Sequence, residues 1–118
     1  VCSVFIGEQD FASFATRTNF KQKSTRRTVF EAVLSNDLPL ITFDICADGF
    51  LYKMVRNIVR AVVKVGEGRS TREDLCRILD AGDRQAAPGT APASGLYLEQ
   101  VFYSQEELSD NVSKRVLL

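Results

Sequence analysis

A chain of 118 residues is long enough for one domain and too short for two. Its composition, 45% hydrophobic and 25% charged, is typical of a packed globular protein and argues against wholesale disorder. The formal net charge is zero, which argues against a surface that is basic throughout but leaves room for a local basic patch.

The sequence contains few of the residues that usually bind a metal ion or form a redox-active pair. It contains no histidine, and its cysteines (Cys2, Cys46 and Cys76) form no CxxC pair, so we expect no zinc site. Reduced thiols of an intracellular protein are the simplest interpretation of the cysteines. No apolar run approaches the roughly 18 residues of a membrane span, and no targeting segment is recognisable. Because the chain begins with Val1, we expect a fragment or processed product of a longer protein.

The first 27 residues are predicted to hold little regular structure. Cys2–Ile6 is predicted as a short strand or lead-in. A short helix is predicted to follow, which Asp10 caps and which places Phe11 and Phe14 on one face. Residues 17–27 are basic and polar without periodicity, and they are predicted to form a loop.

This loop is also the most basic part of the chain. No acidic residue lies between Asp10 and Glu31. A solvated surface and a phosphate-binding surface are equally good interpretations, and Phe20 is available to stack on a base. The cations of the loop are Arg17, Lys21, Lys23, Arg26 and Arg27.

Two alternating segments predict an antiparallel hairpin. In Thr28–Ser35 alternate positions share an apolar face, and in Leu40–Ala47 the alternation is cleaner. Asn36, Asp37 and Pro39 supply turn chemistry between them. Asn and Asp tolerate turn dihedrals, and proline prevents continuation of a helix.

Phe50–Val65 shows the strongest helical periodicity in the chain. An apolar stripe and a basic stripe lie on different faces, and Gly66 and Gly68 are predicted to end the helix. The basic stripe is consistent with a solvated face, and also with a face turned to phosphates or to a buried carboxylate. The apolar stripe is Leu51, Met54, Val55, Ile58 and Val62; the basic stripe is Lys53, Arg56, Arg60 and Lys64.

A second helix and a final strand complete the predicted elements. Ser70 and Glu73 have the spacing of a capping box, and Gly82 is predicted to end this helix. The loop Ala86–Gly95 is rich in small residues, which suits either a surface connector or the close approach of a backbone or nucleotide. A last strand, Leu96–Tyr103, follows.

Together these elements predict an α+β fold. We expect a small antiparallel sheet of about three strands, with helices packed on one of its faces. Residues 1–103 are predicted to form the domain. Residues 104–118 are predicted to form a charged tail that is either a short helix or an arm.

Three strings of residues then make the sequence recognisable. In this order and spacing they resemble the tRNA pseudouridine synthase A family from about Val4 to Tyr103, and the segment Ile78–Arg84 agrees as well. The resemblance implies the C-terminal half of the pseudouridine synthase catalytic fold. The strings are GEQDFASF (Gly7–Phe14), ITFDICADGFLYKMVRNIV (Ile41–Val59) and TAPASGLYL (Thr90–Leu98).

The resemblance implies isomerisation of uridine to pseudouridine in the anticodon arm of tRNA, without cofactor or metal. The uracil is detached from the ribose, turned and rejoined through carbon. The family uses one aspartate, and the arginine matching Arg56 pairs with it and holds it ionised and oriented. The leucine matching Leu96 packs beside the target base, and Tyr97 is placed to stack on it. Tyr52 and Asn57 belong to the same motif as Arg56, and we predict substrate contacts for both.

The sequence departs from the family at two places. The family's aspartate lies in an RTDxGV-like motif of the N-terminal half, and nothing in this chain matches it. The nearest string, residues 17–19, lies in the wrong region and carries an amide. Asp44 and Asp48 are near in sequence, but the family gives them no catalytic role. The family also usually has a small residue at the position of Arg60, where a long cation either crowds the pocket or reaches an RNA phosphate.

The chain alone is therefore expected to be inactive. We expect its partners to be tRNA and the N-terminal half of the enzyme, in cis or in trans, and the family's assembly implies a homodimer. The alternative is a catalytically inactive RNA-binding or scaffold protein derived from this family. The residues predicted to contact RNA are Lys21, Lys23, Arg26, Arg27, Lys53 and Arg60.

Overall fold

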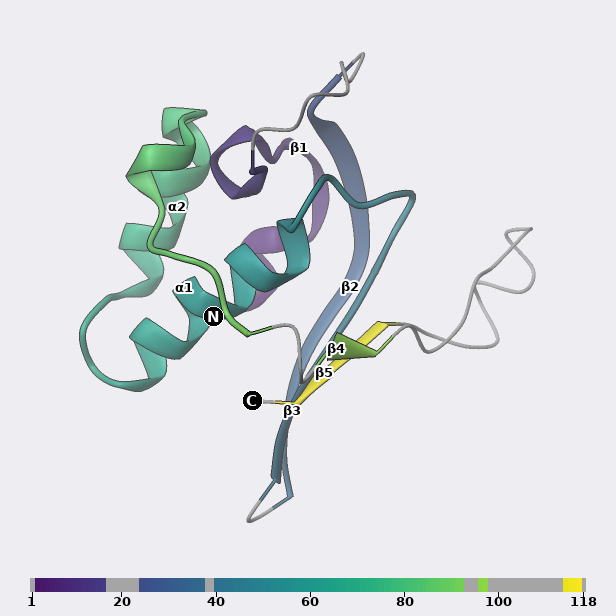
Figure 1. Cartoon of the computed structure of the whole chain (residues 1–118), viewed down its shortest axis with the longest axis vertical. Coiled ribbons are helices and arrows are strands. Elements are labelled where there is room, and N and C mark those ends of the chain that lie inside the picture. Colours follow the sequence, from purple (N-terminus) through teal and green to yellow (C-terminus); the bar gives the residue numbers. More distant parts are fainter. Residues whose placement is uncertain (1, 17–23, 38–39, 93–95, 98–113, 118) are drawn as a thin grey trace.

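The computed structural model describes residues 2–16, 24–37, 40–92, 96–97 and 114–117, and the structural statements that follow concern these residues. They form short 3-10 helices (η), strands and two α-helices (Figure 1). In chain order the elements are η1 (Cys2–Phe5), β1 (Gly7–Asp10), η2 (Ala12–Phe14), β2 (Arg26–Asp37), β3 (Leu40–Ala47), α1 (Met54–Gly66), α2 (Arg72–Ala81), η3 (Arg84–Ala86), β4 (Leu96–Tyr97) and β5 (Lys114–Leu117).

The described strands form a single antiparallel sheet in the order β1-β2-β3-β5-β4. Both α-helices lie on one side of this sheet, so the predicted α+β class is confirmed (Figure 1). The sheet has five strands within the described residues, two more than the sequence indicated. The additional strands are β1 and β5, which are short. Main-chain pairing with a neighbour, rather than an apolar pattern of their own, holds them in the sheet.

The predicted hairpin is present as β2 and β3. Its register pairs Ala32 with Ile45 and Leu34 with Phe43, and a bulge interrupts the pairing between Val29 and Glu31. The strand β2 begins at Arg26, so the end of the predicted basic loop is in fact strand. The turn predicted from Asn36 to Pro39 is shorter than expected, because Asn36 and Asp37 pair with β3 as the end of β2; residues 38–39 lie outside the described residues.

The N-terminal segment differs from its prediction. Cys2–Phe5 is a 3-10 helix rather than a strand, and the first strand begins after this helix, at Gly7. The first residues of β2 pair with Gly7–Asp10, which fixes the strand there despite its polar sequence. The short helix after Asp10 is present as η2, and the Asp10 carboxylate accepts the Ala12 N–H at 3.0 Å.

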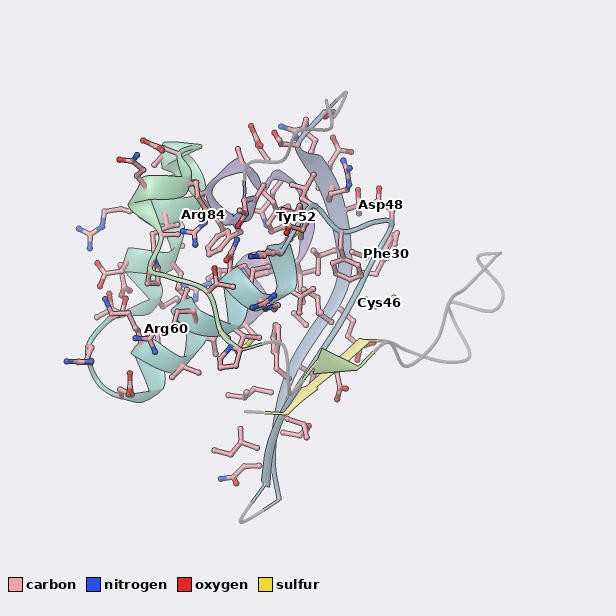
Figure 2. All side chains as sticks on the ribbon, in the orientation of Figure 1. Phe30, Cys46, Asp48, Tyr52, Arg60 and Arg84 are labelled. Carbon is pink, nitrogen blue, oxygen red and sulfur yellow. The ribbon has the colours of Figure 1, made fainter. Side chains whose placement is uncertain are left out.

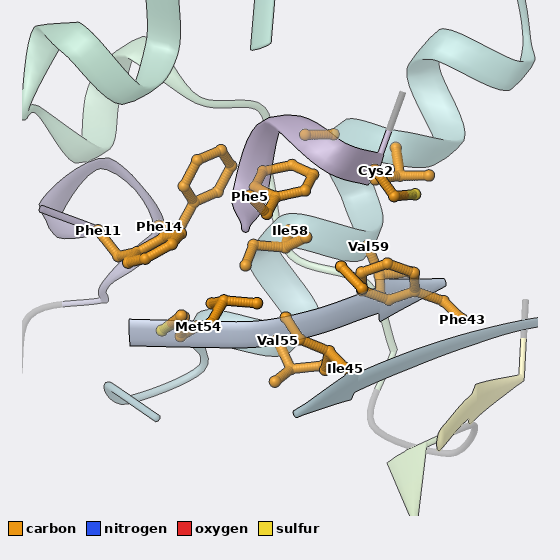
Figure 3. Close-up of a cluster of buried hydrophobic side chains, with 14 of the residues drawn as sticks. Cys2, Phe5, Phe11, Phe14, Phe43, Ile45, Met54, Val55, Ile58 and Val59 are labelled. Atoms are coloured by element: carbon orange, nitrogen blue, oxygen red, sulfur yellow. The ribbon is translucent and has the colours of Figure 1, made fainter. Parts of the chain in front are cut away.

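The core lies between the sheet and α1. The predicted apolar stripe of α1 is buried, with Met54 and Ile58 at 0% exposure, and it meets Phe43 and Ile45 from the sheet (Figure 3). Phe5 packs edge-on against Phe14, with ring centroids 5.7 Å apart. This aromatic contact joins η1 to η2 within the N-terminal segment. Burial of these large side chains is the main source of stability.

The helix α1 starts four residues later than predicted. Its N-cap residue, Lys53, has a φ of 58° and lies in the left-handed region, so the helix begins at Met54. Its C-terminal end is a Schellman motif, as the two glycines indicate. Gly68 has a φ of 76°, its N–H donates to the Val65 carbonyl, and the Arg69 N–H donates to the Lys64 carbonyl.

The helix α2 is present, but its capping box lies one residue further along than predicted. The Thr71 hydroxyl accepts the Asp74 N–H, and the Asp74 carboxylate accepts the Thr71 N–H. The predicted pair, Ser70 and Glu73, has the right spacing, yet the box needs a hydroxyl at the N-cap residue itself. Gly82 ends the helix with a φ of 58°, as predicted.

Two further predictions concern the chain's end and its cysteines. Residues 98–113 lie outside the description, which covers only the start of the last predicted strand, as β4, and the end of the predicted tail, as β5. Cys2 and Cys46 are buried and Cys76 is exposed; none is in a disulfide. Within the described residues, no helix has the length and apolar character that crossing a membrane requires.

Candidate active site

Arg56 is attached to the small-residue loop through both its side chain and its backbone. Its Nε donates to the Ala91 carbonyl at 2.8 Å, and the Ala91 N–H donates to the Arg56 carbonyl at 3.1 Å. Arg56 forms no ion pair with any described residue, and its two terminal guanidinium nitrogens have no described hydrogen-bond partner. The side chain is therefore held through one nitrogen, and the fork that pairs with a carboxylate is left for another group.

Asn57, the next residue, is buried completely and uses all of its side-chain hydrogen-bonding positions. Its Nδ2 donates to the Phe14 carbonyl at 2.7 Å and to Thr16 Oγ1 at 3.2 Å. Its Oδ1 accepts from Thr90 Oγ1 at 2.7 Å and from an Arg84 nitrogen at 3.2 Å. Its contacts in this structure are thus to protein alone. The predicted substrate contact of Asn57 stays untested, while the geometry gives it a positioning role.

Arg84 closes the same network from the loop side. Its Nη1 donates to the carbonyls of Ala87 and Pro88 at 3.3 and 2.9 Å, and its Nη2 reaches Asn57 and Thr90. Figure 2 shows Arg84 where the chain leaves α2 and turns towards α1. One guanidinium therefore shapes the loop and joins it to the buried amide of α1. A planar, permanently charged group suits several such bonds at once.

Ser13 provides a second internal anchor. Its side chain is completely buried. Its Oγ donates to the Ile78 carbonyl and accepts the Asp83 N–H at 2.9 Å. The hydroxyl thus joins η2 to the end of α2, immediately before Arg84. Local sequence patterns do not reveal the roles of Ser13, Arg84 and Thr90, because their partners lie 27 to 70 residues away along the chain. Only the agreement of Ile78–Arg84 with the family pointed to that region.

Tyr52 and Lys53 precede α1 and face outward. The Tyr52 side chain is 48% exposed, and Lys53 Nζ lies 5.4 Å from the centre of its ring, within range of a cation–π contact. The Tyr52 carbonyl accepts the Thr16 N–H at 3.0 Å, so the backbone is fixed while the ring stays accessible (Figure 2). An exposed aromatic ring beside a cation is suitable for stacking on a nucleobase.

Arg60 lies one turn beyond Arg56 on α1 and is partly buried (Figure 2). It makes no ion pair with any described residue. Lys64 lies a further turn along on the same side of the helix. Three members of the basic stripe predicted from the sequence therefore lie in a row on α1 that begins at Arg56, whereas the fourth, Lys53, precedes the helix.

The basic segment before β2 is only partly described. Lys21 and Lys23 lie outside the described residues. Arg26 pairs with Glu8 on β1 at 3.4 Å, and Arg27 donates to the carbonyls of Ser24 and Arg26. Arg27 also passes over Gly49, where a Cβ atom would lie 3.3 Å from its Nε. The two arginines thus have local partners at the edge of the sheet, and their predicted contact with RNA stays a prediction.

The remaining predicted residues belong to β4 and to the turn after β3. Leu96 and Tyr97 form β4, which pairs with β5, so the structure gives the position of their backbone only. The Asp48 carboxylate accepts the Thr28 N–H at 2.9 Å and fixes the end of the hairpin. The structure thus brings Arg56 and Asn57 together with the loop that leads towards β4. It leaves the roles of the two β4 side chains as predictions.

The site has an anchored arginine beside a small-residue loop, and family comparison identifies the class to which it belongs. A family model described as tRNA pseudouridine synthase matches residues 1–104, most of the chain. The chain belongs to this family. The resemblance to pseudouridine synthases that modify tRNA, which was inferred from the sequence, is confirmed as membership of this family.

Curated relatives give the particular member of the family that the chain resembles. This chain is 40% identical over 106 residues to tRNA pseudouridine synthase A of Citrifermentans bemidjiense, and the match covers 89% of this chain and 42% of the relative. It is 41% identical over 106 residues to the Methylacidiphilum infernorum enzyme of the same name, covering 90% of this chain and 42% of that one. The Solidesulfovibrio magneticus enzyme is 44% identical over 101 residues, 85% of this chain and 37% of the relative. The chain thus spans about two fifths of these relatives' length.

Proposed function

We propose that this chain is the C-terminal part of a tRNA pseudouridine synthase that isomerises uridine to pseudouridine in the anticodon arm of tRNA. One observation carries the proposal most directly. Arg56 is fixed through Nε to the Ala91 carbonyl at 2.8 Å, while the two terminal nitrogens of its guanidinium have no described partner. In that arrangement the protein supplies a cation and its support, and the fork of the guanidinium is proposed to pair with a carboxylate.

The missing carboxylate is proposed to come from the rest of the enzyme. A guanidinium within ion-pair distance favours the charged form of a carboxyl group and lowers its pKa, so Arg56 would hold the aspartate ionised and oriented. The chain then supplies one wall of the site, with Arg56 beneath the carboxylate, Leu96 against the uracil and Tyr52 or Tyr97 for stacking. The network around Asn57 and Arg84 keeps the loop in place during the reaction. A fixed geometry of this kind is what positions reacting groups.

The partners follow from this division of the site. We propose that tRNA and the N-terminal part of the enzyme, in cis or in trans, complete it, and that the assembled enzyme is an intracellular homodimer. Lys53 and Arg60 are proposed to contact tRNA phosphates beside the site, along with Lys21, Lys23, Arg26 and Arg27. On its own this chain is expected to bind RNA weakly and to form no pseudouridine.

The test uses the complete enzyme and measures pseudouridine formation in tRNA. Arg56→Ala is expected to lower turnover about a hundredfold or more, because the carboxylate loses its orientation and charge partner. Arg56→Lys is also expected to be poor, since a point charge cannot reproduce a bidentate fork. Arg56→Gln keeps an amide that can donate to Ala91 but removes the charge. It separates the charge of Arg56 from its role in holding the loop.

The control is Arg72→Ala, which removes an exposed cation from α2 and is expected to leave turnover unchanged. Circular dichroism and thermal unfolding check that each variant is folded. Full turnover in a folded Arg56→Gln or Arg56→Ala variant would contradict the assignment of Arg56. If the unaltered complete protein binds tRNA but forms no pseudouridine, the proposed enzyme is wrong and the non-catalytic RNA-binding alternative is supported.

A further inference from the structure

A hollow of about 460 Å³ lies at the far end of α1 from Arg56. It is bounded by the last turn of α1, the first turns of α2 and the segment 86–88. Lys64, Arg69 and Arg77 line it, together with the single carboxylate of Asp74. Its volume is within the range of sites that bind small molecules or single groups of larger ones.

The hollow has an excess of positive charge. The Asp74 carboxylate is already engaged, because it accepts the Thr71 N–H and the Ser70 hydroxyl and pairs with Arg77. Lys64 and Arg69 form no ion pair with any described residue. The capping box satisfies the first donors of α2, so the lysine and arginine side chains, rather than the helix terminus, provide the attraction for an anion.

The lining favours a phosphate or a sugar over a nucleobase. None of the described residues that line the hollow is aromatic, so they offer no ring on which a base could stack. The wall formed by residues 86–88 consists of two alanines and a proline, which leave space close to the backbone. Lysine and arginine beside such a wall are typical of contacts to the backbone of a nucleic acid.

A row of cations connects the hollow to the candidate active site. Arg56, Arg60 and Lys64 are spaced four residues apart on α1, so successive side chains are separated by about 6 Å along the helix. The loop runs along the same helix, since residues 86–88 face Lys64 across the hollow and Ala91 is bonded to Arg56. One continuous edge of α1 therefore leads from the proposed chemistry to the hollow.

We propose that the hollow binds backbone phosphates of the RNA whose target nucleotide lies at Arg56, with Lys64 and Arg69 as the binding groups. This inference rests on the proposed function, because it takes the RNA at Arg56 as given. The row on α1 would then hold a strand of RNA along the helix, and the hollow would bind its end furthest from the reacting base. The site would contribute to affinity for RNA and not to the chemical step.

The test compares the complete unaltered enzyme with the double variant Lys64→Gln/Arg69→Gln by measuring the Kd for fluorescently labelled tRNA at several salt concentrations. Each lost phosphate contact reduces the salt slope by about 0.7, so the double variant is expected to lose about 1.4 from the slope. At 0.1 M salt this corresponds to a roughly twentyfold weaker Kd. Turnover at saturating tRNA is expected to stay unchanged. Arg72→Gln, which removes an exposed cation outside the hollow, is the matched control.

The outcomes separate this inference from the proposed function. An unchanged Kd and salt slope in the double variant, with the unaltered enzyme active, would overturn the inference alone. Stabilisation of the unaltered protein by inorganic phosphate, lost in the double variant without any change in tRNA binding, would identify a small-anion site and also overturn it. If the unaltered protein forms no pseudouridine but the double variant weakens RNA binding as expected, the hollow is supported and the enzymatic proposal fails.

Discussion

The helix α1 carries two kinds of polar side chain that differ completely in their surroundings. Asn57 is 0% exposed and bonded on all sides to the protein, whereas Lys53, Arg60 and Lys64 form no ion pair with any described residue. The comparison teaches that one motif serves two purposes. Its buried amide holds the loop beside Arg56, and its cations are available for a ligand. Stability and binding should therefore separate when these residues are changed one at a time.

The largest expected effect is on the buried side of this comparison. Asn57→Ala removes the partner of four hydrogen bonds and leaves the buried Phe14 carbonyl without the donor that Asn57 supplies, while Arg84 and Thr90 lose their shared acceptor. We expect a loss of about 3 kcal/mol in the free energy of unfolding, because each unsatisfied buried group costs about 1–3 kcal/mol. Urea denaturation of the complete protein measures this loss.

Two control variants make the comparison sharp. Asn36→Ala alters an exposed asparagine of β2 and is expected to change stability by about 0.5 kcal/mol or less. Arg60→Ala is expected to have an equally small effect on stability but to weaken tRNA binding. If Asn57→Ala destabilises no more than these two variants, the network does not hold the loop and the contrast drawn on α1 is wrong.

Much of the fold that supports this contrast could be predicted from local patterns. The apolar stripe of α1 is regular, and the positions from Met54 to Val62 that it predicted as buried are buried. Alternation located β3 to the residue, and the glycines predicted both helix ends. These signals are local, since each depends on residues within one or two turns or on one strand. The hydrophobic effect is also the largest favourable term in folding.

The parts that the sequence did not predict depend on distant partners. The strand β1 is Gly-Glu-Gln-Asp, which has no apolar alternation, and it forms because β2 pairs with it. The Asn57–Arg84 bond joins residues that are 27 positions apart, and nothing local distinguishes this arginine from those of the row on α1. Arg56 and Leu96 were selected through resemblance to a family. The structure adds to this the support of Arg56, which composition and periodicity do not contain.

A smaller effect is expected at Lys53, where a half-buried residue of the same motif carries a backbone constraint. Among the described residues it is the one non-glycine with a positive φ, 58°. Lys53→Val is expected to lower the free energy of unfolding by about 1–2 kcal/mol, because a β-branched residue is strained in the left-handed region. Lys53→Asn is expected to be nearly neutral, since asparagine adopts this conformation readily. Thermal unfolding with a fixed buffer measures the difference.

Arg60→Val is the matched control for this prediction, because it places the same side chain at a partly buried position of α1 with ordinary helical backbone. Its expected cost is below about 0.7 kcal/mol, the range of ordinary helix propensities. Equal costs for Lys53→Val and Arg60→Val would show that the left-handed backbone of Lys53 contributes no strain. The residues around α1 would then differ only in how deeply their side chains are buried, and not in backbone strain.

The smallest expected effect extends the contrast to the cysteines, since Cys46 is buried and Cys76 exposed. Burial, and then the nearby Glu31 carboxylate, raises the pKa of the Cys46 thiol above its ordinary value of 9.0. The folded state therefore binds this proton more tightly than the unfolded state. The stability that Cys46 contributes is complete below 9.0 and is lost as the pH rises towards the folded pKa.

Two measurements test this prediction between neutral pH and about pH 10. The difference in unfolding free energy between the unaltered protein and Cys46→Ala is expected to shrink as the pH rises, because only the former has this thiol to ionise. At mildly alkaline pH, iodoacetamide is expected to alkylate Cys76 first and Cys46 slowly, since the thiolate is the reactive form and Cys46 is enclosed. Equal alkylation rates of Cys46 and Cys76 in the folded protein would mean that Cys46 is open to solvent. The same conclusion would follow if the difference in unfolding free energy between the unaltered protein and Cys46→Ala did not depend on pH. The surroundings of Cys46 would then be less well packed than the interior around Asn57.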